Sequence, residues 1–68
     1  METRALQVFL TVADTLNFSR SAEHLHMSVS AVSRAIAKIE DEVGQPLLER
    51  DRRKVRLTTG GREFREYA

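Results

Sequence analysis

The chain has 68 residues, of which 41% are hydrophobic, so it has room for one small domain but not for a deep substrate cavity. It has no cysteine for disulfides or thiolate sites, and no apolar run long enough to span a membrane, so we expect a soluble, cytoplasmic protein without a membrane partner. The net charge of +1 is unevenly distributed, with four bases and seven acids in residues 1–49, and seven bases and three acids in residues 50–68.

The first predicted element is an amphipathic helix that begins near Thr3, a candidate N-cap, and ends at Asn17. Asn17 is a plausible left-handed stop because asparagine tolerates that conformation better than most residues. Apolar residues at steps of three and four predict its buried face: Leu6, Phe9, Leu10, Ala13 and Leu16, widened by Val12. Phe18 follows as a predicted core residue.

Two further helices follow the first in close succession. Ser19 is expected to open a short helix from Arg20 to about Leu25. After a turn, Ser28 is expected to cap a longer helix over residues 29–43, which Gly44 ends. The apolar face of the longer helix is formed by Val29, Val32, Ile36, Ile39 and Val43. A different face carries Ser33, Arg34, Ala37 and Lys38.

A small β-hairpin is predicted next. Pro46 excludes a continuing helix. Residues 47–49 and 55–58 are short β-compatible runs that flank a basic turn. Five of the seven bases in the C-terminal part fall within residues 50–56, and such a cluster can attract phosphates, although a charge run alone is more often a solvated turn.

A last helix is predicted at the C-terminal end of the chain. Thr58 or Thr59 is expected to cap it. Gly60 and Gly61 weaken its first turn by about 1 kcal/mol each relative to alanine. One face of this helix carries Phe64, Tyr67 and Ala68. We expect the chain to be mainly helical, with one buried cluster formed by Leu6, Phe9, Leu10, Ala13, Phe18, Ala22, Leu25, Val32, Ile36, Ile39, Leu47 and Leu57.

The two consecutive helices joined by a tight turn have the arrangement of a helix-turn-helix. Ser30, Ala31 and Ser33 are small, so the start of the second helix can approach base edges and phosphates closely. Arg34 can donate to guanine O6 and N7 in the major groove. The hairpin tip, residues 52–54, would form a basic wing that reaches the DNA backbone or the minor groove. A plain three-helix bundle with a charged surface fits this pattern equally well.

Five stretches give the sequence a resemblance to a known family. The stretches are residues 9–13, 18–26, 33–36 leading into 39–40, 44–50 and 55–61. Together they resemble the N-terminal DNA-binding domain of bacterial LysR-type transcriptional regulators, over essentially the whole chain. The resemblance implies a winged helix-turn-helix over residues 1–58 that binds double-stranded DNA sequence-specifically, and the start of a dimerisation linker helix over residues 59–68. It also implies that the family's C-terminal effector domain is absent from this chain.

The resemblance assigns roles to individual residues of this chain. It implies that Ser33 and Arg34 face bases, and that Arg50 and Arg53 meet the backbone or the minor groove. This chain has Val29-Ser30 where the family usually has Gln-Pro, which replaces an adenine-reading amide with a methyl-bearing residue suited to a thymine methyl. The predicted base contacts are Val29, Ser30, Ser33 and Arg34. The predicted backbone or minor-groove contacts are Arg20, Ser28, Ala31, Lys38, Arg50, Arg52, Arg53 and Lys54.

The resemblance also implies partners. A fold this small needs stabilising help, so we expect oligomerisation or a longer parent chain. The family resemblance implies a homodimer through Phe64, Tyr67 and Ala68, and a tetramer in the full-length protein. Because this seam buries little apolar area, we expect only weak self-association of the chain itself. A small-molecule coinducer would bind the missing domain, and we expect no cofactor in this chain.

His26, residues 44–47 and Arg50-Asp51 resemble, more narrowly, the branch of the family that activates branched-chain amino-acid synthesis. That likeness implies a role in regulating this biosynthesis. The alternative is a winged-helix module that contacts other proteins and does not bind DNA. We expect no catalytic residues and no enzyme activity, because the mere presence of serine, histidine and aspartate does not make a catalytic triad. We expect no metal site, because His24 and His26 lie two apart and point to different faces of a helix.

Overall fold

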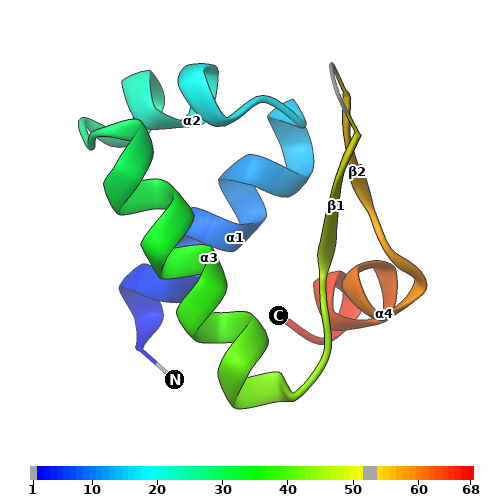
Figure 1. Cartoon of the computed structure of the whole chain (residues 1–68). Helices are drawn as coiled ribbons and strands as arrows, with labels where there is room; N and C mark the ends of the chain where they lie inside the picture. Colours follow the sequence, from blue (N-terminus) through cyan, green and yellow to red (C-terminus); the bar gives the residue numbers. More distant parts are fainter. Residues whose placement is uncertain (1, 52–53) are drawn as a thin grey trace.

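The computed structural model describes residues 2–51 and 54–68. The described residues form α1 (Thr3–Thr15), α2 (Phe18–Leu25), α3 (Val29–Val43), β1 (Leu48–Asp51), β2 (Lys54–Leu57) and α4 (Thr59–Tyr67). Figure 1 shows α1, α2 and α3 packed as one group, with the hairpin standing beside them and α4 near the base of the hairpin. This arrangement confirms the predicted mainly helical class with a two-stranded wing. None of the described helices is long and apolar enough to cross a membrane.

The ends of α1 differ from the prediction. Thr3 is the first helical residue, and Glu2 occupies the N-cap position without a side-chain hydrogen bond, so the predicted cap at Thr3 is wrong. Leu16, at φ 52°, takes the left-handed position that was predicted for Asn17. Asn17 is extended, and its side chain accepts a hydrogen bond from the Arg20 backbone N–H at 2.9 Å. Asparagine therefore acts as the N-cap of α2, which begins earlier than predicted.

The boundaries of α3 agree with the prediction. The Ser28 hydroxyl accepts a hydrogen bond from the Ala31 N–H at 3.0 Å, as an N-cap should. Gly44, at φ 84°, ends the helix in the left-handed conformation that glycine adopts without a steric penalty. His26, at φ 55°, ends α2 in the same way and directs the chain into the turn between the two helices.

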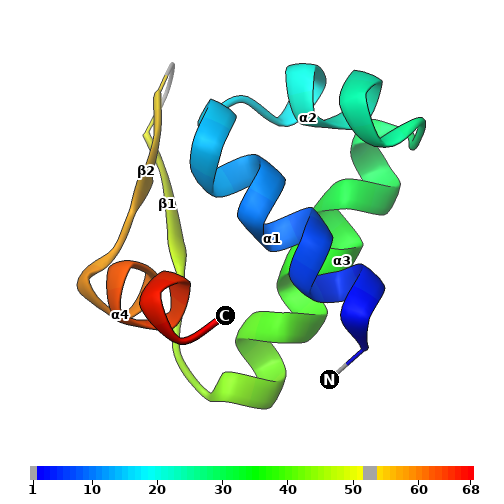
Figure 2. The same ribbon diagram turned by 180° about the vertical axis from the view of Figure 1, so that it is seen from behind.

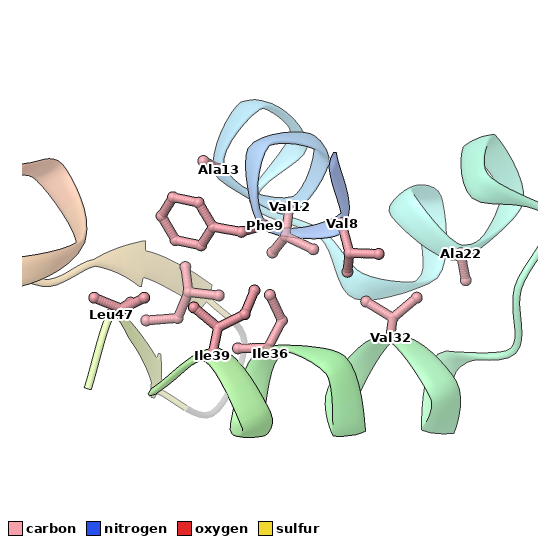
Figure 3. Close-up of a cluster of buried hydrophobic side chains, with 10 residues drawn as sticks. Val8, Phe9, Val12, Ala13, Ala22, Val32, Ile36, Ile39 and Leu47 are labelled. Atoms are coloured by element: carbon pink, nitrogen blue, oxygen red, sulfur yellow. The ribbon is translucent and has the colours of Figure 1, made fainter. Parts of the chain in front are cut away.

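The core lies where α1 crosses α3, and Leu47 closes it from the side of the hairpin (Figure 3). Its buried hydrophobic residues are Val8, Phe9, Val12, Ala13, Ala22, Val32, Ile36, Ile39, Leu47 and Leu48. Leu10, Phe18, Leu25 and Leu57 pack against it only partly buried. The predicted face of α1 is therefore rotated. Leu6 is half-buried outside the cluster, Leu16 is 41% exposed, and Val8 is buried although it was not predicted.

One carboxylate ties the end of α3 to the hairpin. Glu40 is one of three consecutive acids at the C-terminal end of this helix, where they oppose the helix dipole. Its Oε2 accepts hydrogen bonds from the backbone N–H groups of Leu47 at 2.7 Å and Leu48 at 3.1 Å. Both leucines are buried, so these N–H groups would otherwise lack a partner. Glu40 thus fixes the start of β1 against α3.

Replacing Glu40 by alanine should therefore lower the free energy of unfolding by about 2 kcal/mol, because it leaves two buried donors unpaired. Chemical denaturation of the two proteins measures the difference. Glu42→Ala is the matched control, since Glu42 is exposed and the substitution should change stability by about 0.5 kcal/mol or less. Equal effects of the two substitutions would show that the hydrogen bonds of Glu40 contribute little.

The helix α4 is held against α1 and the hairpin. Figure 2 shows α4 beside the base of the hairpin from behind. The rings of Phe9 and Phe64 meet edge to face, with centroids 5.2 Å apart. Arg65 Nη2 lies 2.5 Å from Asp14 Oδ1 in an exposed ion pair. The Thr58 hydroxyl accepts from the Gly61 N–H at 2.9 Å, so Thr58 is the cap of this helix. These contacts fix where the end of α4 lies relative to α1.

Candidate nucleic-acid interface

The first turns of α3 present a surface of small and basic side chains. Ser28, Ser30 and Arg34 are exposed, whereas Ala31 and Ser33 are half-buried. Val29 begins the apolar stripe of the helix, yet it is 44% exposed and lies outside the core. Its methyl groups are therefore accessible on the same helical end as the polar residues.

The N-terminal end of α3 is also suited to anions. The side chain and the carbonyl of Ser28 accept from the N–H groups of Ala31 and Val32. The N–H groups of Val29 and Ser30 belong to the first helical turn, which has no intrahelical acceptors for them. Exposed N–H groups and the positive end of the helix dipole favour a phosphate. The small side chains leave room for one to approach.

Basic residues extend this surface along the helices. Arg34 and Lys38 are exposed on α3, four residues apart, and so lie on one face of the helix. Arg20 is exposed on α2. Ser30, Arg34 and Lys38 follow one another at four-residue steps, so they form a continuous strip from the N-terminal end of α3.

The hairpin is antiparallel, and its strands lie close to the predicted positions. The observed strands, residues 48–51 and 54–57, are paired so that Leu48 faces Leu57 and Asp51 faces Lys54. Each strand reaches further into the predicted basic turn than expected. Lys54 is exposed. The predicted contacts Arg52 and Arg53 lie outside the described residues.

The wing also reaches the helices through Arg50, in a contact that the sequence does not predict. Arg50 Nη2 donates a hydrogen bond to Ser33 Oγ at 2.8 Å. The guanidinium carbon lies 4.0 Å from the centroid of the Phe18 ring, which places the cation over the aromatic face. The structure thus brings together two of the predicted site residues, Arg50 and Ser33, and adds Phe18, which was predicted only as a core residue. No sequence signal links three residues so far apart in the chain.

The predicted dimer seam is divided between two environments. Phe64 is half-buried and uses its ring for the edge-to-face contact with Phe9. Tyr67 is 88% exposed, and Ala68 is exposed. Tyr67 lines a shallow surface hollow together with Val43 and Gly60. The apolar surface that this seam offers a second chain is accordingly small.

Comparison with known proteins places this arrangement in a family. Residues 3–62 match the family model described as bacterial regulatory helix-turn-helix protein, lysR family. The HTH-type transcriptional activator IlvY of Haemophilus influenzae is 46% identical over all 68 residues, and the Hca operon transcriptional activator HcaR of Escherichia coli is 50% identical over the same length. This chain spans 23% of the length of each of these relatives.

Solved structures show the same fold. The structure of Vibrio fischeri DarR in complex with DNA matches 98% of this chain, and 23% of its own chain, at a TM-score of 0.93 and 37% sequence identity. The agreement covers the helix-turn-helix, the wing and the final helix, since so little of the chain is left out. Residues 3–62 match the family model, and IlvY of Haemophilus influenzae is 46% identical over all 68 residues. The protein therefore belongs to the lysR family of bacterial regulatory helix-turn-helix proteins.

Proposed function

We propose that this chain binds double-stranded DNA sequence-specifically, with the N-terminal half of α3 in the major groove and the wing on the backbone or in the minor groove. The observation that carries the proposal is the exposed surface of Val29, Ser30 and Arg34 at the end of a capped helix, beside a basic hairpin. Such an end fits the major groove, which admits an α-helix. The family consists of transcription regulators, not enzymes.

Base reading is proposed for four residues of α3. Arg34 can donate two hydrogen bonds to guanine O6 and N7. The exposed Val29 can place its methyl groups against a thymine methyl, and Ser30 and Ser33 can hydrogen-bond to base edges. The four residues lie within about one and a half turns of α3, so they would contact neighbouring base pairs.

Backbone contacts are proposed for residues around this centre. Ser28 and Ala31 lie at the N-terminal end of α3, where the helix dipole attracts a phosphate. The remaining candidates are the bases Arg20, Lys38, Arg50, Arg52, Arg53 and Lys54. Such contacts set the position of the protein on the duplex and make its binding depend on salt. They do not themselves identify a sequence.

Assembly remains a proposal of the same kind. We propose that residues 1–58 are the DNA-binding unit and that residues 59–68 begin a helix that pairs two chains. Tyr67 and Ala68 supply the exposed part of the seam. Because Phe64 already packs against Phe9, the seam is smaller than the sequence predicts, and association of this chain alone should be weak. A tetramer, and a coinducer bound elsewhere in a longer protein, are further expectations for the whole regulator.

A finer proposal concerns the regulated process. The identity with IlvY supports the proposed role in branched-chain amino-acid biosynthesis. HcaR is slightly more identical over the same residues, so the DNA-binding residues alone favour neither regulator strongly. The bound sequence is therefore the most informative measurement, since duplexes selected from a random pool can be compared with the operators of each relative.

Arg34→Ala is expected to weaken binding to the selected sequence by about 1–3 kcal/mol and to relax the preference at one base pair of each half-site, because a bidentate contact to guanine is lost. Selection from a random duplex pool, followed by titration at two salt concentrations, measures both effects. Arg62→Ala, which removes the same charge from α4, should leave the selected sequence unchanged.

The rival interpretation, a winged helix that contacts only proteins, predicts a different result. Affinity for duplex DNA would then not rise as the salt concentration falls, and no sequence would be enriched. An unchanged sequence preference in Arg34→Ala, with the parent protein still selective, would instead show that α3 lies in another register on the groove.

A further inference from the structure

The side chain of Arg50 connects three elements of the fold. It extends from β1, stacks over the ring of Phe18 at the start of α2, and donates to the hydroxyl of Ser33 on α3. The distances are 4.0 Å from the guanidinium carbon to the ring centroid and 2.8 Å from Nη2 to Oγ. One side chain of the wing therefore touches both helices of the helix-turn-helix.

The chemistry of this contact requires arginine. A guanidinium is planar, so it can lie flat over an aromatic ring while its edge directs N–H groups sideways to an acceptor. Contact with the Phe18 ring thus limits where the guanidinium of Arg50 can lie, and the hydrogen bond to Ser33 limits its position further. A lysine keeps the charge, but its ammonium is not planar. It cannot lie flat over the ring and donate sideways to Ser33 at the same time.

The contact also constrains the hydroxyl of Ser33. A serine hydroxyl has one hydrogen to donate and two lone pairs to accept with. One lone pair accepts from Arg50, so the hydroxyl keeps its hydrogen to donate but only one lone pair with which to accept. In a major groove this arrangement favours a base acceptor, namely guanine O6 or N7, adenine N7 or thymine O4, over the amino groups of cytosine and adenine.

We propose that Arg50 is a positioning residue that fixes the orientation of the Ser33 hydroxyl and so sets the base preference at the pair that Ser33 meets. The inference rests on the proposed DNA binding. It differs from the backbone contact proposed for Arg50 above, because it assigns the effect of Arg50 to the sequence that is read. A backbone contact changes the affinity for all sequences alike.

The test compares Arg50→Lys, Ser33→Ala and the double variant by selection from a random duplex pool and by salt titration. We expect Arg50→Lys and Ser33→Ala to lose the preference at the same base pair, by about five-fold each, which is the size of one hydrogen bond. The double variant should lose no more than either single variant, because both remove one interaction. The salt dependence of Arg50→Lys should equal that of the parent, since its charge is retained.

A second variant removes the other partner of the same contact, the ring of Phe18. Phe18→Leu removes the ring beneath the guanidinium and leaves every charge and the Ser33 hydroxyl in place. It should relax the preference at the same base pair, provided that circular dichroism shows a folded protein at the assay temperature. If Arg50→Lys does not fold, Phe18→Leu alone decides, and an unchanged preference in Phe18→Leu would overturn the proposal.

Other results would also overturn it. The proposal fails if Arg50→Lys selects the same sequence as the parent while Arg50→Gln weakens all sequences alike and lowers the salt slope by about one, since Arg50 is then a direct phosphate contact. It also fails if Ser33→Ala keeps the parent's preference. A parent protein that enriches no sequence at all would overturn the proposed function itself, which separates the two failures.

Discussion

Replacing Phe9 by alanine should lower the free energy of unfolding by about 3–5 kcal/mol. Phe9 on α1 is completely buried and points into the space between α3 and α4 (Figure 3). Its ring meets that of Phe64 edge to face, with the centroids 5.2 Å apart. The substitution leaves a cavity in the centre of a core that is only about ten residues in size. Small domains are stable by about 5–15 kcal/mol, so urea denaturation should show a large fraction of the stability lost.

Leu6→Ala is the control for this experiment. Leu6 belongs to the face of α1 that the sequence predicts as buried, yet it is half-buried and lies outside the core cluster. Its replacement should cost about 1 kcal/mol or less, since little apolar area returns to water. If Leu6→Ala cost as much as Phe9→Ala, the predicted face of α1 would be correct and the observed packing of this helix would be wrong.

The sequence predicts α3 well because its signals are local. Ser28 supplies the N-cap, Gly44 supplies the left-handed end, and the apolar residues between them repeat at helical steps. No alternative start or end competes with these signals. The hairpin and α4 are predicted nearly as well, since Pro46 separates them from α3 and Thr58 caps the last helix.

The buried face of α1 is harder to predict because apolar residues surround much of the helix. Leu6, Leu10 and Leu16 are as hydrophobic as Val8, so periodicity does not decide which of these residues are buried. The structure decides through packing. Val8 and Val12 face α3, while Leu16 leaves the helix in the left-handed conformation and stays exposed.

Part of the candidate site could be predicted from the sequence, and part of it depends on packing. Exposure of Ser30 and Arg34 follows from the helical pattern of α3, and their expected roles follow from the family resemblance. The contact of Arg50 with Ser33 and Phe18 joins three elements and depends on how these elements pack. No local sequence pattern predicts that packing. Arg52 and Arg53 of the predicted hairpin tip lie outside the described residues, so their roles stay predictions.

At one of the two paired glycines of α4, helix propensity alone predicts the wrong effect of an alanine substitution. As helical residues, Gly60 and Gly61 each weaken the helix by about 1 kcal/mol, so alanine at either position should be stabilising. A Cβ atom on Gly61 would overlap the carbonyl oxygen of Leu47 and lie 2.9 Å from its carbonyl carbon. Packing of α4 on the hairpin therefore requires a glycine at this position, whatever the helix propensity.

Gly61→Ala is accordingly expected to lower the free energy of unfolding by about 3 kcal/mol, at the upper end of the cost of overpacking. The obstacle is backbone and cannot swing aside, because Leu47 is buried and its carbonyl accepts from the Thr58 N–H at 3.0 Å. Moving α4 away instead would disturb the ring contact between Phe9 and Phe64.

Gly60→Ala is the matched control, one residue away in the same turn. A Cβ on Gly60 would meet the end of the Gln45 side chain, with the amide oxygen at 2.5 Å, and an exposed glutamine can rotate away. The variant should be neutral or more stable by up to about 1 kcal/mol, because the helix gains propensity and the unfolded chain loses freedom. Thermal unfolding of both variants gives the comparison. If Gly61→Ala were as stable as Gly60→Ala, α4 would not pack against Leu47 as described, and the position of α4 relative to the hairpin would have to be revised.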